Sequence, residues 1–384
     1  MKRVMVVFGT RPEAIKLAPV VLALNTSTVF DPVVVVTAQH REMLDQVLDL
    51  FGIRPDVDLD LIRHHQSLSE LTARVLGSLA PVISSARPDV VVVQGDTTTT
   101  LAGALTAFYH HIPVVHIEAG LRTQNRYSPF PEEVNRRLTS QLTTLHLAPT
   151  ATSRANLVGE GVCPDAVVVT GNTVIDALAW AVERTLPAVD ATLAGIEADS
   201  RALILVTAHR RESWGAAMEG IGRALAEIGS RRPEVLIVFP IHRNPDVRRA
   251  IQQAVAGVPN IALVEPLSYG DFVRLLERCY LILTDSGGIQ EEGPSLGKPV
   301  LVMRDTTERP EAVAAGTVAL VGTDPDRIVA SVGRLLDDRR AYESMGHAIN
   351  PYGDGQATRR TLAALAHMFG EGPRPDEFDP LSSE

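Results

Sequence analysis

The chain has 384 residues, which is more than one compact hydrophobic core usually holds, so we expect two domains with a cleft between them. It carries 36 Lys and Arg against 46 Asp and Glu, a formal net charge of -10, which argues against nucleic acid or an anionic membrane surface as the main partner. The two cysteines, Cys163 and Cys279, are far apart and form no CxxC pair, which excludes a disulfide framework or a zinc knuckle and fits a reducing cytoplasm.

Short β-branched runs alternate with helical patterns along the first half of the chain. The first run ends at Phe8, where charged residues follow, so it is too short for a signal peptide or a membrane span. The runs lie at residues 4–8, 33–37, 90–93, 114–117 and 167–170. This alternation is typical of parallel strands that are buried on both faces and joined by helical crossovers.

The alternation stops and then restarts, which indicates a second domain. Residues 185–200 contain no strand-like run. Further runs follow at residues 202–206, 235–239, 261–264, 280–283 and 299–303. We therefore predict two doubly wound α/β domains, with the boundary between Gly171 and Asp199. The polar, proline-rich end of the chain, residues 371–384, predicts a disordered tail.

In doubly wound sheets, ligands bind beyond the carboxyl ends of the strands, so the residues that follow each strand are the informative ones. GTRPEAIK, residues 9–16, follows the first strand; Pro12 suits the first helical position, and Lys16 shares a helix face with Glu13. The stretch matches neither the GxGxxG dinucleotide fingerprint nor the GxxxxGK(S/T) phosphate loop. Taken alone, it favours a helix N-terminus with a solvated Arg11 and a surface pair between Glu13 and Lys16.

Carboxylates follow the next two strands and begin the segment after them. Asp96 lies in QGDTTT and Glu118 in HIEAGLRT, at the tips of neighbouring strands, and Glu132 lies in PFPEEVNRR. Three arginines could meet them: Arg122, Arg136 and Arg137. Converging carboxylates separate each other's pKa values, which provides an acid and a base at one pH. Each residue alone would also suit a helix cap or a first helical turn, but three in succession favour a site.

Basic side chains follow two strands of the second predicted domain. The run 202–206 leads into TAHRRES, with His209 and Arg210, and the run 235–239 leads into PIHRNP, with His242. A single histidine is more often structural than catalytic. At a strand end facing the cleft, however, an imidazole could donate to an anionic oxygen or relay a proton. A polar turn into a helix explains His242 equally well.

The stretch TDSGGIQEE resembles a holder for a nucleoside diphosphate. Ser286 suits a helix N-cap, and Gly287 and Gly288 would let phosphates approach backbone N–H groups at the positive end of the helix dipole. Glu292 lies one turn further on the same face, where its carboxylate could accept two hydrogen bonds from a ribose diol, whereas Glu291 is rotated away and favours a structural role. A capped helix with acidic residues in its first turn is the alternative interpretation.

Eight segments together resemble one family along nearly the whole chain, from about residue 2 to residue 370. They are GTRPEAIKLAPV, QGDTTTT, HIEAGLRT, PEEVNR, GNTVIDAL, TAHRRES, TDSGGIQEEGPSLGKPVLVMRDTTERPE and NPYGDG. They are similar, in this order, to those of the non-hydrolysing UDP-N-acetylglucosamine 2-epimerases. The resemblance implies the GT-B fold, with two Rossmann-like domains, an active site in the cleft between them, and UDP held mainly by the second domain. We expect domains at 1–172, joined by a C-terminal helix 356–370, and at 173–355.

The resemblance also implies a reaction. The family interconverts UDP-N-acetylglucosamine and UDP-N-acetylmannosamine without a redox cofactor or a metal, by eliminating UDP to a 2-acetamidoglucal and adding it back. The residues that match the family's catalytic positions are Asp96, Glu118, Glu132 and His209, the last near the diphosphate. Those that match its substrate contacts are Arg11, Lys16, Phe272, Ser286, Gly287, Gly288, Glu292 and Arg309. The motifs do not assign which carboxylate is the base and which is the acid.

Many bacterial members of the family bind a second UDP-N-acetylglucosamine, which activates them. The residues here that fit that site are Gln39, His40, Arg210 and His242. Glu42 stands where a glutamine is common, and His65 where an arginine is common. Because an added carboxylate and a lost fixed cation both weaken diphosphate binding, we expect allosteric activation to be weak, altered or absent.

Three other functions are alternatives to epimerisation. A hydrolysing 2-epimerase would release N-acetylmannosamine and UDP, but its members usually carry a different first loop from GTRPEAIK. A GT-B glycosyltransferase would need an acceptor groove, which the density of charged residues around one sugar argues against. A non-catalytic sensor of nucleotide sugars has no use for Asp96, Glu118 and Glu132 together. The family resemblance further implies a homodimer with a UDP-sugar as its partner. The charge balance and the cysteine count add the expectation of a cytoplasmic protein that binds neither nucleic acid nor a membrane.

Overall fold

The computed structural model describes residues 1–38, 41–61, 63, 66–184, 191–208, 215–242 and 244–381. The chain forms two compact units: unit 1 comprises Met1–Trp180 and Tyr352–Glu384, and unit 2 comprises Ala181–Pro351. The first connection therefore falls inside a helix, eight residues beyond the expected end of the first domain at residue 172. The second connection lies just before the turn that leads into the last helix.

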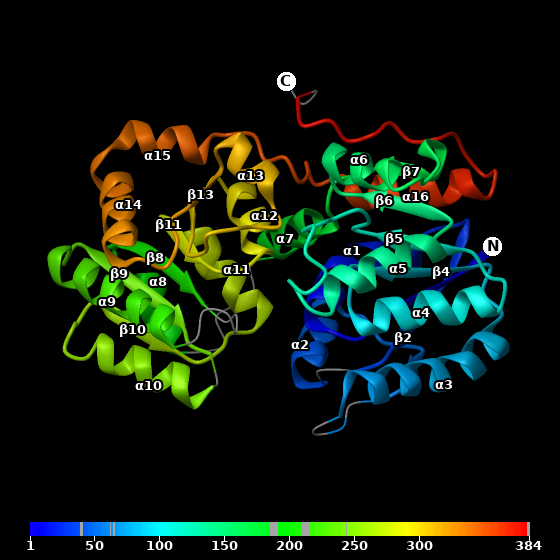
Figure 1. Ribbon diagram of the computed structural model, residues 1–384, viewed down its shortest axis with the longest axis horizontal. Helices are drawn as coiled ribbons and strands as arrows, with labels where there is room; N and C mark the ends of the chain where they lie inside the picture. The colour runs from blue at the N-terminus through cyan, green and yellow to red at the C-terminus, as the bar shows by residue number, and fades with distance from the viewer. Residues whose placement is uncertain are drawn as a thin grey trace. The chain divides into compact units, whose positions relative to one another are not determined.

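Unit 1 is built around one parallel sheet of seven strands, in the order β3-β2-β1-β4-β5-β6-β7 (Figure 1). Its strands are β1 Lys2–Phe8, β2 Phe30–Val36, β3 Val57–Asp58, β4 Val90–Gln94, β5 Val114–Ile117, β6 Leu145–Ala148 and β7 Val167–Val169. Its helices are α1 Arg11–Asn25, α2 Arg41–Phe51, α3 Leu68–Ala86, α4 Thr98–Tyr109, α5 Glu132–Leu142, α6 Ala151–Gly159, η1 Pro164–Ala166, α7 Thr173–Glu183 and α16 Ala357–Met368. The last of them packs on α1, so the end of the chain completes the fold of its beginning.

Unit 2 repeats this topology with six parallel strands, in the order β10-β9-β8-β11-β12-β13 (Figure 1). Its strands are β8 Ala202–Thr207, β9 Val235–Pro240, β10 Ile261–Val264, β11 Leu281–Thr284, β12 Val300–Val302 and β13 Val318–Leu320. Its helices are α8 Ala191–Ala198, α9 Ala216–Arg231, α10 Pro245–Ala254, α11 Tyr269–Arg278, α12 Ile289–Ser295, α13 Pro310–Ala315, α14 Pro325–Asp337 and α15 Arg339–Gly346. None of the helices in the described ranges combines the length and apolarity needed to cross a membrane.

Buried aliphatic strands explain both sheets. β4 reads VVVVQ and is buried at every position, and every strand pairing in both sheets is parallel. Because both faces of such a sheet are covered by crossover helices, its strands read as continuous apolar runs. The predicted α/β class with two doubly wound parallel sheets is confirmed. Three short strands, β3, β6 and β13, were missed, since none contains a β-branched run of four residues.

The end of the chain corrects one expectation. Residues 371–381, expected to be disordered, pack against unit 1. Phe378 is buried and its backbone N–H donates to Val169 O at 2.8 Å. The guanidinium of Arg374 donates to Val167 O at 2.6 Å, and Arg154 pairs with Glu377 at 3.1 Å. The segment thus covers β7, which is one of the two edge strands of the sheet.

Candidate active site

The first candidate site lies in unit 1, at the carboxyl ends of β1, β4 and β5. The strand order reverses between the neighbours β1 and β4, and doubly wound sheets bind ligands at such a switch point. Gly9 follows β1, and a Cβ atom there would lie 2.0 Å from Thr37 Oγ1 and 2.8 Å from Thr99 Oγ1. Only glycine fits this position, because the backbone there lies against the hydroxyl groups of Thr37 and Thr99.

Glu13 fixes the turn after β1. It is buried, and its carboxylate accepts hydrogen bonds from Gly9 N at 3.1 Å and Thr10 N at 2.8 Å. The hydroxyl of Thr97, in the turn after β4, donates to it at 2.7 Å. Burial raises the pKa of Glu13, and the hydrogen bonds that it accepts oppose that effect. The predicted surface pair between Glu13 and Lys16 is therefore wrong, because Glu13 ties two strand-end turns together inside the fold.

Lys16 contacts Glu118 instead. Its Nζ lies 2.6 Å from Glu118 Oε1, and both side chains are largely buried. Asn172 Nδ2 donates to the same oxygen at 2.9 Å, and Gln94 Nε2 donates to Oε2. Glu118 adopts a positive φ of 63°, which is uncommon outside glycine and asparagine. Three donors from three separate segments thus hold one carboxylate at the end of β5.

Asp96 occupies the neighbouring strand end. Its carboxylate pairs with Arg136 Nη2 at 2.9 Å and keeps 27% of its side-chain surface exposed, so a ligand can still reach it. Asn135 Nδ2 donates to the backbone oxygen of Asp96 at 2.9 Å. Glu133, fully buried in α5, lies 3.7 Å from Arg136 Nε on its other side. Arg136 is therefore held between a buried carboxylate and the accessible Asp96.

The three arginines predicted near the carboxylates divide between two roles. Arg136 binds Asp96, one of the three predicted carboxylates. Arg122 pairs with Glu160 at 2.7 Å, and Arg137 pairs with Glu133 at 2.9 Å. These two arginines anchor α5 and α6. Glu132 is half-buried at the first position of α5.

A buried histidine, His116, holds the turn that follows β4. His116 Nε2 donates to Gly95 O at 2.7 Å, the tautomer that a carbonyl acceptor requires. Burial, with smaller contributions from nearby arginines, lowers the pKa of His116 to about 4. His146 lies directly across from it on β6, and burial lowers the pKa of His146 to about 3. Both imidazoles are therefore neutral at pH 7.

The glycine-rich turn of unit 2 differs from its prediction at Ser286. The N-cap of α12 is Gly288, two residues later, with no side-chain cap. The backbone N–H of Ser286 donates to Thr284 Oγ1 at 2.9 Å, so this serine belongs to the turn after β11. Glu292 is almost fully buried and accepts a hydrogen bond from Tyr269 OH at 2.9 Å.

Glu291 has the structural role predicted for it. It is fully buried and pairs with Arg309 Nε at 2.6 Å. Arg309, which the family resemblance assigned to the nucleotide site, therefore also holds α12 in place. Phe272 is half-buried in α11.

Most of the predicted allosteric residues are outside the described residues. Those that lie there are Gln39, His40, His65 and Arg210, together with the catalytic candidate His209. His242 is half-buried, and its Nδ1 accepts a hydrogen bond from Asn244 N at 3.1 Å. Glu42 is exposed in the first turn of α2, and Arg11 is half-buried in the first turn of α1.

Sequence reasoning missed Gln94, Asn172 and Glu133. Gln94, in QGDTTTT, is the last residue of β4, and Asn172, in GNTVIDAL, follows shortly after β7, so both lie near strand ends, as Asp96 and Glu118 do. An amide side chain carries no charge, so a pattern of charged residues does not indicate it, although its N–H groups can donate to a carboxylate. Among the described residues, no group of three His, Cys, Asp or Glu is placed to hold a metal ion.

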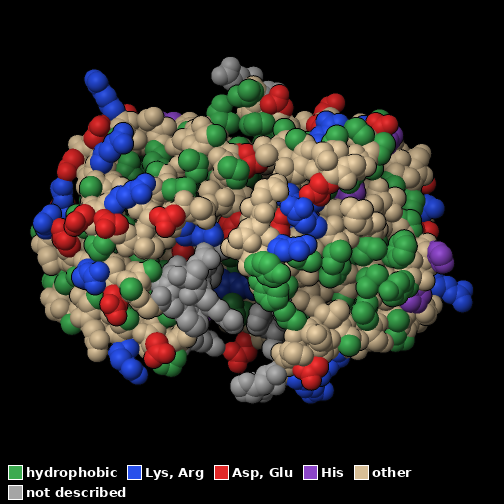
Figure 2. Space-filling model, in the orientation of Figure 1, with side chains coloured by type: hydrophobic (Ala, Val, Ile, Leu, Met, Phe, Trp, Pro, Cys, Tyr) green, Lys and Arg blue, Asp and Glu red, His purple; other side chains and the backbone are tan. Residues whose placement is uncertain are grey.

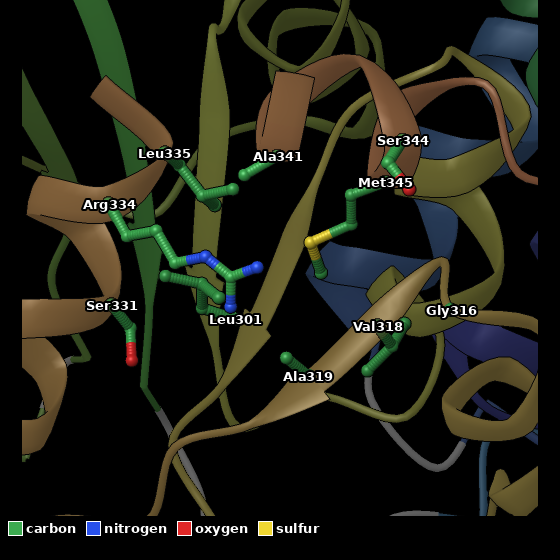
Figure 3. Close-up of a pocket in the computed structure, with 10 residues that line it drawn as sticks. All are labelled: Leu301, Gly316, Val318, Ala319, Ser331, Arg334, Leu335, Ala341, Ser344 and Met345. Carbon is green, nitrogen blue, oxygen red and sulfur yellow. The ribbon is translucent and has the colours of Figure 1, made fainter. Parts of the chain in front are cut away.

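A separate cavity of about 290 Å³ lies in unit 2 among β12, β13, α14 and α15 (Figure 3). Its walls are mostly apolar, including Leu301, Val318 and Met345, and Arg334 extends over Leu301 (Figure 3). No predicted site residue lines it. The chemistry indicated by the strand-end carboxylates therefore belongs elsewhere.

Known proteins agree with the geometry. The family model described as UDP-N-acetylglucosamine 2-epimerase matches residues 22–366. The chain belongs to the UDP-N-acetylglucosamine 2-epimerase family. The enzyme of that name from Yersinia pestis is 57% identical over 368 residues, which cover 94% of this chain and 98% of that one. The Escherichia coli enzyme is 55% identical over 369 residues, with the same coverage of 94% and 98%.

A solved structure of this epimerase family shares the fold as well. The UDP-GlcNAc 2-epimerase from Neisseria meningitidis, bound to UDP-GlcNAc, superposes with a TM-score of 0.89 at 50% identity. The match covers 95% of this chain and all of that chain. The two doubly wound sheets are therefore the GT-B-like architecture of the 2-epimerases.

Proposed function

We propose that this protein is an isomerase that interconverts UDP-N-acetylglucosamine and UDP-N-acetylmannosamine. The observation that carries the proposal is the carboxylate pair at the switch point of unit 1, Asp96 with Arg136 and Glu118 with Lys16, in a chain that matches epimerases over 94% of its length. A hydrolysing 2-epimerase and a GT-B glycosyltransferase are the alternatives that the experiment below distinguishes.

The proposed route is elimination and re-addition. A base removes the proton at C2 of the sugar, the C1–O bond breaks with its electron pair going to UDP, and a C1=C2 double bond forms. UDP then adds back to C1 while an acid protonates C2 from the opposite face. The departing diphosphate needs positive charge or N–H donors, and C2 needs a base and an acid.

We assign the roles by chemistry and position. Asp96, Glu118 and Glu132 supply the acid and base groups, and His209 acts at the diphosphate. Asp96 keeps an accessible carboxylate, which supports direct contact with the sugar. Glu118 accepts three hydrogen bonds, one from an ammonium, which supports an ionised form.

The remaining assigned residues are proposed contacts of the substrate. Arg11 and Lys16 stand at the start of α1 and favour an anionic ligand there by their charge. The other proposed contacts are Phe272, Ser286, Gly287, Gly288, Glu292 and Arg309 for the nucleotide.

We infer a homodimer in the cytoplasm. Phe108 and Tyr109 on α4 and Leu138 on α5 are 54%, 65% and 49% exposed, on helices that pack together. Figure 2 shows hydrophobic side chains gathered over these helices. A surface of this kind supports association with a second copy. Light scattering should give twice the chain mass, and Tyr109→Lys should lower it.

The two cysteines are unpaired, which supports a reducing compartment.

We further infer that activation by a second UDP-N-acetylglucosamine is weak, altered or absent. The proposal rests on Glu42, which would place a carboxylate near a diphosphate, and on His65 in place of a fixed cation. The rate of the reverse reaction should then depend hyperbolically on UDP-N-acetylmannosamine. A sigmoidal curve that trace UDP-N-acetylglucosamine makes hyperbolic would contradict it.

Proton NMR of the enzyme with UDP-N-acetylglucosamine in deuterated buffer tests the function. We expect UDP-N-acetylmannosamine with deuterium at C2, without added NAD, metal or acceptor. Free N-acetylmannosamine and UDP would instead identify a hydrolysing enzyme. Absence of exchange at C2, with transfer of the sugar to an added acceptor, would identify a glycosyltransferase.

A further inference from the structure

The proposed mechanism leaves the motif GNTVIDAL without a role. Asn172 stands in it, between β7 and α7, and is buried with 2% of its surface exposed. Its Nδ2 donates to Glu118 Oε1 at 2.9 Å, and its Oδ1 accepts a hydrogen bond from Val174 N at 3.2 Å. One amide group therefore joins the start of α7 to the carboxylate at the end of β5.

The carboxylate needs this donor. Glu118 is buried, so its carboxylate has lost hydrogen bonds to water. This loss costs free energy unless protein groups donate hydrogen bonds in place of water. Lys16 and Gln94 supply two further donors, from α1 and β4. Because the three donors stand on three segments and bind both oxygens, together they fix the position of the carboxylate. Without the amide, the position of Oε1 would depend on the flexible side chain of Lys16.

The backbone of Asn172 is held as firmly as its side chain. Its N–H donates to Tyr352 O at 2.7 Å, and Tyr352 is completely buried. Tyr352 is the first residue of unit 1 after the chain returns from unit 2, and α7 leads out to unit 2. Asn172 thus stands where both connections of the chain meet within unit 1, and its amide reaches from there to Glu118.

We propose that Asn172 is a positioning residue for Glu118. It fixes the carboxylate of Glu118 for proton transfer at C2, and it links the position of that carboxylate to the segment where the chain leaves and re-enters unit 1. The proposal rests on the proposed epimerase function. It concerns catalysis through Glu118, since Asn172 itself is not assigned to the substrate.

Two substitutions separate this role from helix capping. Asn172→Ser removes the donor to Glu118 and keeps a side chain that can cap α7. Asn172→Asp keeps the oxygen that accepts from Val174 N and places a second carboxylate beside Glu118. The matched control is Asn260→Ser in unit 2, which removes an amide of similar burial that donates to Val235 O at 3.0 Å.

The expected result is a loss in kcat with little change in KM. Asn172→Ser should lower kcat about 10- to 100-fold, the effect of a reacting group misplaced by about 1 Å. The acid limb of its kcat profile should move to higher pH, because the charged form of Glu118 has lost a donor. Asn172→Asp should lose more, and should recover towards Asn172→Ser as the pH falls and the added carboxyl becomes protonated. Asn260→Ser should keep the wild-type kcat and pH profile.

A measurement without substrate judges the contact separately from the function. Thermal unfolding of Asn172→Ser, Glu118→Gln and the double variant should show a smaller loss of Tm in the double variant than the sum of the two single losses. Additive Tm losses, or an Asn172→Ser enzyme with wild-type kcat and pH profile, would overturn the proposal. If wild-type protein produces no epimer, the proposed function fails, and the Tm cycle still decides whether Asn172 holds Glu118.

Discussion

Acid should destabilise unit 1 through His116. This residue lies in β5 with no exposed surface, and burial lowers its pKa to about 4. The pKa of an unfolded histidine is about 6.5. Between pH 6.5 and 4 the unfolded chain therefore binds more protons than the folded one, so the stabilising effect is complete above pH 6.5 and is lost as the pH falls towards 4. The difference of about 2.5 pH units, at about 1.4 kcal/mol each, amounts to roughly 3 kcal/mol at pH 4.

The variant His116→Gln removes the titration and keeps the hydrogen bond. A glutamine amide can donate to Gly95 O much as the ring Nε2 does, at 2.7 Å in the wild type. The charges facing His116 are Glu118, Arg122 and Arg136, which the variant leaves in place. Relative to wild type, the free energy of unfolding of His116→Gln should therefore improve by roughly 3 kcal/mol between pH 7 and pH 4.

Urea unfolding followed by tryptophan fluorescence measures this difference. Trp180 lies in unit 1, with its ring centroid 4.3 Å from that of Phe51, so its emission should report unfolding of that unit. A Trp214→Phe background leaves Trp180 as the only tryptophan. The control is His367→Gln, at an exposed position in α16. Equal pH dependence of stability in His116→Gln and wild type would refute the reasoning, as would an equal effect of the control.

Three further outcomes follow from the structure. Ellman's reagent should modify one thiol in the native protein and two in denaturant, because Cys163 is exposed whereas burial raises the pKa of Cys279 to about 12. Glu291→Ala should lower the free energy of unfolding by about 3 to 5 kcal/mol in urea titrations, because it removes one carboxylate of a buried ion pair with Arg309. Deletion of residues 373–384 should lower the Tm of unit 1 by about 4 to 8 °C in calorimetry, from the loss of one buried aromatic side chain. A Tm unchanged by the deletion would show that the docked tail contributes nothing to stability.

The sequence was sufficient to predict the sheets, because strands that are buried on both faces consist of continuous runs of valine, isoleucine and leucine. It was insufficient where a contact depends on which distant segments become neighbours. Asn172 and Glu118 are 54 residues apart, and nothing in either motif indicates that an amide meets a carboxylate. Lys16 shows the same limit, because a local helix-face argument paired it with Glu13, whereas strand order brings Glu118 to it.

Two other errors have local causes. Ser286 has the composition of an N-cap, but Thr284 Oγ1 binds its N–H and the helix starts later. Residues 371–384 have the composition of a disordered tail, yet a single phenylalanine and two charged contacts dock most of it. The composition of a segment is an average over its residues. It therefore does not show that one buried side chain is enough to dock a segment of otherwise polar residues.

The division of the chain has a consequence for its synthesis. Unit 2 is continuous, whereas unit 1 requires both the first 180 residues and those from Tyr352 onward. At about 5 to 20 residues per second, roughly 10 to 40 s pass on the ribosome between the end of the first part of unit 1 and the arrival of the last. During that interval α1 has no α16 to cover it, and β7 is an open sheet edge. Newly made chains should therefore need protection at that edge until the C-terminus emerges, even though unit 2 can already be folded.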